Sequence, residues 1–491
     1  MAPALQPIPT DVPAAPFAAI DLSHLTAKHP ERTVWEPLWD DYRLLYRGGE
    51  EFRRAAGQVS TTRTHLAQDI ATGVWATQAA TRNPIRRFLH QLEAEPHEKY
   101  LARWNRAVYI NDFGAIIDYF VHWLFSQPPT IRPEDSAEAP PWFEILSRDC
   151  DGKRTSFEHF VRDTFREALL TRYTGWAIGT PDMAVALMSQ AEVEENEIAG
   201  VRLTAYRAEE ICDWQTNEAD DLEWVVLSKQ RLVRDFPAGR RTVETFLYLD
   251  RAEWAAWERT KGGEGQQDQV VLQGEGSHGI GAVPFVVLEV PFGLWVANKL
   301  AMWAIDLFNQ VSMLADGQLL SCFLQPCLWT NEGDMNAQAR VFGPGILRNL
   351  RTSSGDRGEE KFGWVAPSTE PLRFSSEQIQ KRLNEGYRIV HQMSVAVDPS
   401  SASVQVRSGV SKTEDRLPTE IILGGYGGYV RAAMRKTLDL VSRALGGAER
   451  WYVVGYDHFN VRSLDEELQT AALIRSLQPK SPTARKIIEK N

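Results

Sequence analysis

Hydrophobic residues recur along this chain with two different spacings, and the change of spacing divides the sequence. Near the start, Trp35, Trp39, Tyr42 and Tyr46 follow a helical period that the pair Gly48-Gly49 ends. A stronger helical stripe is predicted in residues 100–131, where Pro128-Pro129 ends it, and another helix over residues 157–175. The stronger stripe consists of Ile116, Ile117, Phe120, Val121, Leu124 and Phe125.

The spacing changes to two between about residues 201 and 290. Runs rich in β-branched and aromatic residues appear there, including "VRLTAYRAEEICDW", "LEWVVLSKQRLVRDF", "RTVETFLYLD" and "VPFVVLEV". These runs predict a mostly antiparallel sheet. The charged, glycine-rich "RTKGGEGQQDQ" between them is typical of a solvated hairpin tip.

A long apolar helix is predicted from Leu294 to Trp329. At 1.5 Å per residue it is long enough to cross a bilayer. Polar side chains interrupt it too often for that role, because each would be costly to place in lipid. The interrupting residues are Lys299, Asp306, Asn309, Gln310, Asp316 and Gln318.

The remainder alternates between turn-rich segments and helices. A Gly/Arg-rich stretch follows Trp329, then a helix over residues 375–397, a polar loop and a long helix over residues 411–445. The cluster "GGYGG" within this last helix predicts a kink or a close helix crossing, because each glycine costs about 1 kcal/mol relative to alanine. A strand-like "RWYVVGYDHFNV" and a basic helix close the chain.

Composition narrows the possible functions. With 43% hydrophobic residues and 16 Trp, the chain is expected to fold and to need large anchors in its core or its subunit contacts. The net charge of -11 argues against general adhesion to nucleic acid, so any DNA contact should be local. The N-terminal 30 residues lack the features of a secretory signal and predict a flexible Pro/Ala arm on a cytoplasmic protein.

Catalytic and metal-binding motifs are weak. The sequence "GEGSHG" at Gly274–Gly279 matches a dinucleotide fingerprint, but a strand-like run follows it where a helix is required, so we interpret it as a hairpin turn. The four cysteines form no CxxC pair, and the histidines are scattered. Acidic runs at residues 192–197 and near Asp220 and Asp221 are best explained as solvated loops.

The order of these segments resembles that of the portal proteins of tailed bacteriophages. "YINDFGAIIDYFVHWLFSQPPTI" is similar to an early helix of that family, and "YRAEEICDW" to a following strand. "VPFVVLEV" before "ANKLAMWAIDLFNQVSMLADG" resembles the passage from wing sheet to stem helix. "VRSGVSKTEDRL" resembles the start of the family's long helix after the tunnel loop.

The resemblance implies an α+β portal fold and a division of the chain. Its expected parts are a flexible arm (1–30), a wing (31–292), a first stem helix (293–325), a small α/β clip (326–374), a second stem helix (375–397), a tunnel loop (398–410), a long kinked helix with a return strand (411–462) and a short C-terminal crown helix (463–491).

The resemblance also implies roles for particular residues. The stem surface between subunits is expected to consist of Leu294, Ala301, Ile305, Phe308 and Ser312, with Lys299, Asp306, Asn309 and Asp316 facing water or partners. The DNA channel is expected to include Lys381, Arg382, Arg388, Ser400, Ser401, Ser403, Gln405 and Arg407. The docking rim is expected to include Arg340, Phe342, Arg348, Arg351, Arg357 and Trp364, with Trp329 and Phe362 as further anchors.

On this interpretation the chain performs no covalent chemistry and needs no cofactor or metal. It would form a ring of twelve copies at the capsid vertex of a virion, after assembly in the host cytoplasm. Its expected partners are double-stranded DNA in the channel, the large terminase, the major capsid and scaffolding proteins, and the connector and tail proteins.

Two other classes of function stay open from the sequence. Clustered carboxylates allow a nucleic-acid-processing hydrolase, although a convincing Glu-x-Lys partner is missing. The apolar segment 294–329 allows a membrane-associated protein.

Overall fold

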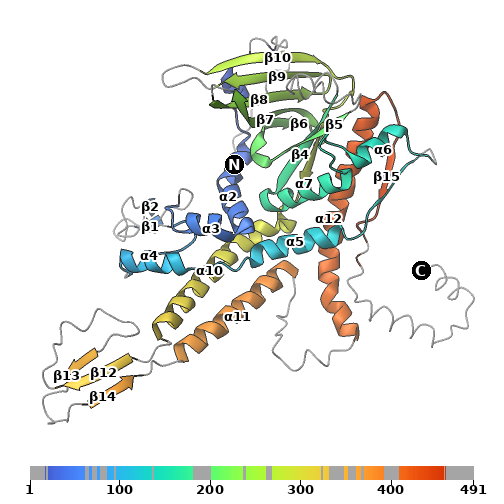
Figure 1. The fold of residues 1–491 in the computed structure, drawn as a ribbon. Helices are drawn as coiled ribbons and strands as arrows, with labels where there is room; N and C mark the ends of the chain where they lie inside the picture. The colour runs from blue at the N-terminus through green and yellow to red at the C-terminus, as the bar shows by residue number, and fades with distance from the viewer. Residues whose placement is uncertain are drawn as a thin grey trace, which may run out of the picture.

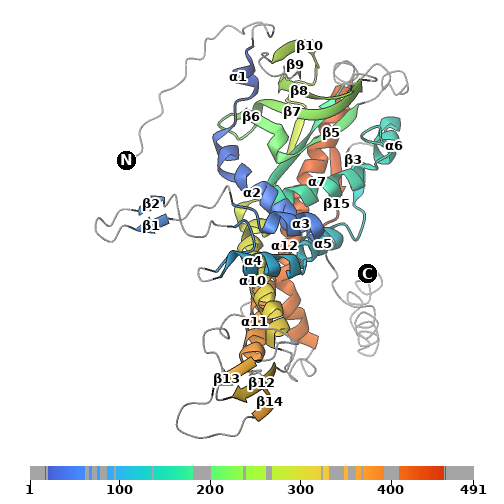
Figure 2. The same ribbon diagram turned by 60° about the vertical axis from the view of Figure 1, so that its left-hand side comes forward.

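The computed structural model describes residues 17, 20–60, 66–68, 75–77, 86–92, 95–134, 138–180, 201–235, 239–260, 268–321, 325–330, 348–351, 361–365, 370–391, 409–457 and 459. Helices and sheets are mixed, in agreement with the predicted α+β class. A body of helices and four sheets, two of them two-stranded, carries a pair of helices that project from it and end in a small sheet (Figures 1 and 2).

The first helices are α1 (Leu22–Leu25), α2 (Pro30–Arg47) and α3 (Gly49–Ala56). Gly48 and Gly49 both have positive φ, 61° and 63°, which explains the predicted break. The end of the expected flexible arm is ordered: Phe17, Leu22 and Leu25 pack on a sheet beside Trp257. The arm boundary at residue 30 was therefore wrong, because these apolar side chains cover the sheet.

The predicted helix over residues 100–131 is divided into two. After the short pair β1 (Leu66–Gln68) and β2 (Trp75–Thr77), the chain forms α4 (His97–Arg106) and α5 (Asp112–Leu124). Asn111 begins α5 because its Oδ1 accepts from the Gly114 N–H at 2.9 Å. The predicted stripe from Ile116 to Phe125 is buried, as expected.

The next helices are α6 (Pro141–Arg148) and α7 (Phe157–Thr171). The predicted helix end near Gly175 was wrong, because α7 stops at Arg172, whose φ is +79°, and β4 (Tyr173–Gly179) follows. A second strand, β3 (Thr130–Pro133), pairs antiparallel with β15 (Trp451–Val454) near the other end of the chain.

The region with a period of two forms two antiparallel sheets. The sheet β11-β4-β5 joins β4 to β5 (Arg202–Tyr206) and β11 (Phe285–Glu289). After the short helix η2 (Ala208–Glu210), the five-stranded sheet β10-β9-β8-β7-β6 contains β6 (Ile211–Thr216), β7 (Leu222–Asp235), β8 (Gly239–Asp250), β9 (Glu253–Thr260) and β10 (Gln269–Ser277).

The motif "GEGSHG" is mostly strand. Gly274 and Gly276 lie inside β10, where the register with β9 shifts between Leu272 and Gly274, and only Gly279 has a positive φ. The hairpin-turn interpretation was therefore wrong for its first residues. Its main consequence holds, because β11 rather than a helix follows.

The projecting part begins after the turn η3 (Phe292–Leu294). It consists of α10 (Val296–Ser321), a sheet of β12 (Gln325–Thr330), β13 (Arg348–Arg351) and β14 (Lys361–Val365), and α11 (Glu370–His391). In this sheet β12 is central, parallel to β13 and antiparallel to β14. The two helices lie close to the boundaries expected for the stem, but the helix predicted to continue to Trp329 ends at Ser321, and residues 325–330 form β12 instead.

The long helix α12 (Gly409–Ala444) runs unbroken through the four glycines. One glycine is required by packing: a Cβ at Gly427 would lie 1.7 Å from the carbonyl oxygen of Tyr456. The predicted close approach is thus present, but its partner is the chain after β15 rather than another helix. The residues expected to form the tunnel loop before Ser408 and the crown helix lie outside the described residues.

Candidate functional site: the stem and its distal sheet

The two projecting helices, which we call the stem, pack in an antiparallel arrangement. Trp303 of α10 lies on Gly386 of α11, where a Cβ would come within 2.2 Å of the indole ring, and its Nε1 donates to the Arg382 carbonyl at 2.6 Å. Farther out, a Cβ at Gly317 would lie 3.3 Å from the Leu372 side chain. Because glycine has no side chain, Gly386 and Gly317 let the two helices approach closely at two positions along the stem.

The half of α10 nearest the body is enclosed by its own chain. Ala301, Ile305, Phe308 and Ser312 are all buried, and the Phe308 ring meets Phe52 edge-on at 5.1 Å. Leu294 packs beside Gly425, and its carbonyl accepts a hydrogen bond of 2.5 Å from Tyr426. The predicted contact with other subunits was wrong for Ala301, Ile305, Phe308 and Ser312, because the body covers them. Leu294 is only partly buried, and its predicted subunit contact stays a prediction.

Asn309 was expected to face water or a partner, and this was also wrong. Its side-chain amide donates to the carbonyls of Phe88 and Ile305, and its Oδ1 accepts from the His90 N–H at 2.8 Å. It therefore ties the segment before α4 to the stem helix. Asp316, another polar residue of α10, pairs with Arg106 of α4.

The outer half of the stem and the sheet at its end, the distal sheet, expose large apolar side chains. Met313 and Leu319 on α10 are 41% and 43% exposed, and Phe374 on α11 is 62% exposed. On β14, Phe362 and Trp364 are each 60% exposed, with ring centroids 6.0 Å apart. The distal sheet is the part that projects farthest from the body in Figure 2. An apolar surface of this kind usually marks a contact with another molecule.

Charged residues on α11 fall into paired and unpaired groups. Arg382 contacts Glu385 at 2.8 Å and Asp306 of α10 at 3.5 Å, and the hydrogen bond with Glu385 raises its pKa. Lys381 and Arg388 are exposed and make no ion pair within the described residues. Their spacing of seven places them on one face of the helix. Of the three cations predicted to line the channel on α11, Lys381 and Arg388 are therefore without an ion pair in the described part of the chain, whereas Arg382 is paired with carboxylates.

The remaining predicted site residues are only partly described. Arg348 and Arg351 lie on β13, opposite Cys327 and Thr330 of β12. Trp329 lies on β12, opposite Leu350 and Lys361. The others lie outside the described residues; they are Arg340, Phe342, Arg357, Ser400, Ser401, Ser403, Gln405 and Arg407.

Sequence reasoning missed the contact between Trp303 and Gly386. The one sign of it in the sequence is Gly386, a glycine inside a helical segment. To pair it with Trp303 we would have needed to know how the two helices are aligned. It also missed Phe374, whose apolar side chain interrupts a charged helix segment.

No helix in the described part of the chain is long and apolar enough to cross a membrane. No group of three or more His, Cys, Asp or Glu side chains in this part of the chain is arranged to hold a metal ion.

Comparisons with known proteins give distant likenesses. No protein-family model matches the sequence, and no curated protein matches it. A chain in the virion of a native gene transfer agent particle is similar at a TM-score of 0.38 and 11% identity, covering 76% of this chain and 88% of that one. A chain in the neck of an empty gene transfer agent particle, computed with C6 symmetry, gives a TM-score of 0.39 with the same identity and coverage. Likenesses of this level carry no argument about function.

Proposed function

We propose that this chain is a portal subunit of a phage-like particle. Copies of it would assemble into a ring at one vertex of the capsid, and double-stranded DNA would pass through the ring. The terminase would dock on the distal sheet during packaging, and connector and tail proteins would bind there afterwards. Capsid and scaffolding proteins would contact the outside of the ring.

The observation that carries this proposal is the exposed apolar surface of the projecting stem. Met313, Leu319 and Phe374 lie on the two stem helices, and the described residues leave them 41%, 43% and 62% exposed. Fully burying an exposed side chain of this kind is worth about 1.5–3 kcal/mol, so burying the exposed part of each is worth roughly half of that. Neighbouring stems in a ring would bury them all, because every copy presents the same surface to the next one.

The charges of the stem fit a channel that guides DNA without gripping it. Each phosphate neutralised by a lysine or arginine adds salt-dependent affinity, so a strongly basic wall would hinder sliding. The described part of α11 offers Lys381 and Arg388, while Arg382 is neutralised by Asp306 and Glu385. The net charge of -11 makes the rest of the surface repel the phosphates of DNA on average.

The distal sheet fits a docking role. Phe362 and Trp364 form an exposed aromatic pair on an edge strand, and aromatic anchors of this kind often supply most of the free energy of binding at an interface. Arg348 and Arg351 on the opposite edge add positive charge. On this proposal the chain has no catalytic step, and the energy for DNA movement comes from the separate terminase.

Imaging of the purified chain by negative stain, with light scattering on the same sample, tests the proposal. We expect rings with a central hole and a mass of many subunits. A compact monomer at micromolar concentration that also fails to enter capsids during co-expression would contradict it.

A further inference from the structure

A groove far from the stem is not used by the proposed function. It runs between α12 and the segment that includes β11, and its two hollows share Ala432 and Lys436 as a common wall. The larger hollow has a volume of about 530 Å³. We call this the α12–β11 groove; its lining includes Tyr429, Ala433, Leu440 and Arg443 of α12, facing Ala282, Val283, Val287 and Pro291.

The groove is elongated. Its lining residues on α12 run from Tyr429 to Arg443, which corresponds to about 21 Å at 1.5 Å per residue. An extended peptide of about six residues, at 3.3 Å each, has this length. A compact small molecule would fill only part of it.

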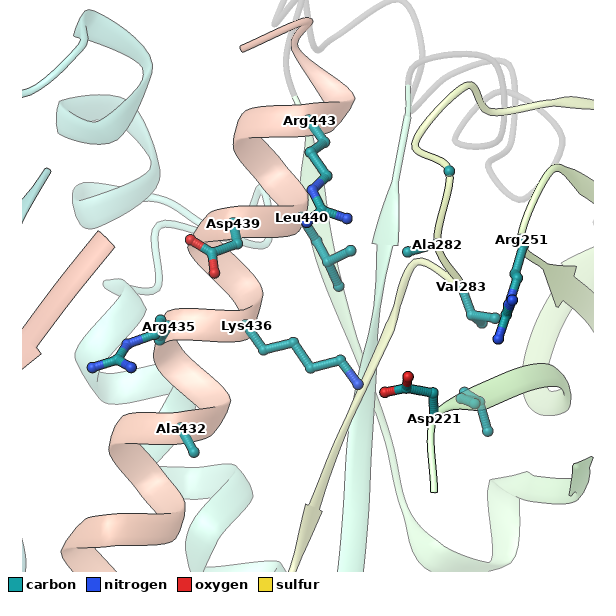
Figure 3. A pocket seen from close by; sticks show the side chains of 12 residues that line it. Asp221, Arg251, Ala282, Val283, Ala432, Arg435, Lys436, Asp439, Leu440 and Arg443 are labelled. Atoms are coloured by element: carbon teal, nitrogen blue, oxygen red, sulfur yellow. The ribbon is translucent and has the colours of Figure 1, made fainter. Parts of the chain in front are cut away.

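One end of the groove is cationic. Lys436 extends from α12 across the gap toward Asp221, and Arg251 comes from the facing side, with Arg443 one turn beyond Leu440 (Figure 3). Arg435 and Asp439, on the other flank of α12, also line this hollow (Figure 3). Four cations and two carboxylates therefore line this end of the groove, on a chain whose overall charge is negative.

These cations differ from most arginines of the body. Arg43, Arg103 and Arg259 are each held by carboxylates at 2.9 Å or less. Within the described residues, by contrast, Arg251, Lys436 and Arg443 make no ion pair. All three side chains are exposed to solvent, and Lys436 points toward the Asp221 carboxylate across the gap (Figure 3). An acidic side chain in the groove would form charge-assisted hydrogen bonds with these cations.

The other end of the groove is apolar, with Val287 and Tyr429 both exposed. A side hollow of about 160 Å³ adjoins it and shares Val287, Glu289 and Lys436 with the groove. Tyr173, which is almost fully buried, lines this hollow, and its hydroxyl has no hydrogen-bond partner among the described residues. Glu31, Asp220 and Glu289 also line it, so the hollow suits a neutral anchoring side chain rather than an acidic one.

From these features we infer that the α12–β11 groove binds an extended acidic segment of a partner protein. The acidic residues would lie at Arg251, Lys436 and Arg443, and a neutral apolar side chain would lie near Tyr429 and Val287. Duplex DNA fits poorly, because the rigid double helix is far wider than one extended chain, whereas the groove is a recess between two elements.

A labelled peptide with glutamates at one end and leucines at the other tests the inference by fluorescence anisotropy on the full chain. We expect saturable binding that weakens at higher salt, and at least a tenfold loss of affinity in the double variant Lys436→Glu/Arg443→Glu. Arg450→Glu is the matched control, because it reverses an exposed charge outside the groove. Circular dichroism checks that each variant is folded, and Arg251→Glu replaces the double variant if that one unfolds.

Any one of four results would overturn the inference. The first is no binding of the peptide to the unaltered chain. The second is an equal loss of affinity in Arg450→Glu. The third is a DNA duplex that binds as tightly as the peptide and is lost with the same groove variants. If light scattering shows that the groove variants change only the oligomeric state, with peptide binding intact, the groove belongs to a contact between copies and the inference also fails.

Discussion

Trp303 of α10 rests directly on Gly386 of α11, and no atom of a side chain fits between them. A Cβ built at position 386 lies 2.2 Å from the Trp303 ring, and the indole N–H donates to the Arg382 carbonyl on the same turn of α11. The contact sets both the distance between the stem helices and their register. Gly386 lowers the helix propensity of α11, but it also allows the close contact between the two stem helices.

Gly386→Ala should therefore lower the free energy of unfolding by about 1–3 kcal/mol, because overpacking at the contact outweighs the higher helix propensity of alanine. Urea denaturation measures the change. Gly424→Ala in α12 is the control, since nothing lies within 4 Å of its Cβ position, and it should stabilise the chain by about 0.5–1 kcal/mol. If Gly386→Ala also stabilises, the helices are not in contact at this level.

Ile305→Asp should unfold the body rather than only prevent assembly. Ile305 is 2% exposed inside its own chain, and an unpaired carboxylate there costs several kcal/mol. The comparison variant Met313→Asp should keep the circular dichroism spectrum and the melting temperature, because Met313 is exposed. Light scattering should nevertheless show loss of rings in Met313→Asp. Rings that persist in Met313→Asp would place the subunit contact elsewhere.

Trp364→Ala should leave folding and ring formation unchanged while reducing DNA packaging at least tenfold, because the exposed aromatic pair is the proposed docking anchor. Packaged DNA per assembled particle is the quantity to measure. Tyr452→Ala, which removes an exposed aromatic side chain from the body strand β15, serves as the control. Normal packaging by Trp364→Ala would remove the distal sheet from the docking surface.

Acid should destabilise the contact that holds the segment before α4. Burial acts to raise the pKa of Glu95, but hydrogen bonds from Arg103, at 2.7 and 2.8 Å, and from the Leu92 N–H lower it below the usual value of 4.5. A lowered pKa in the folded state adds stability that is present above about pH 4.5 and is lost as the pH falls through the folded pKa. Melting temperatures between pH 6 and pH 3 should fall less steeply in Glu95→Gln than in the unaltered chain. Equal slopes would show that this pair contributes little.

The order of helices and strands along the chain was predicted better than the contacts that their side chains make. The change of hydrophobic period at residue 201 located the sheets, and the two stem helices appeared within a few residues of the expected boundaries. The break before Asp112 was missed because the apolar pattern continues across it, although Asn111 is a favourable N-cap. Strand β4 was missed because its first residues are compatible with an extension of the preceding helical stripe.

Site residues were harder to predict for a physical reason. An apolar pattern says that Ile305 and Phe308 need to be covered, but it does not say whether their own chain or a neighbour covers them. Asn309 shows the same difficulty for polar residues, since an amide on an apolar helix can face water or complete a buried set of hydrogen bonds. Lys381 and Arg388 are exposed on α11, and their role in a DNA channel stays a prediction.

The fixed base of the stem has a mechanical meaning. Ile305, Phe308 and Asn309 hold α10 in the body, and Ser321 at its far end lies about 18 Å beyond Asn309 along the helix. A beam held at one end bends most at its support, so a force applied to the distal sheet exerts its greatest torque where α10 leaves the body, beyond Asn309. The hydrogen bonds of Asn309 to Phe88 and His90 would therefore resist tilting of the stem under load.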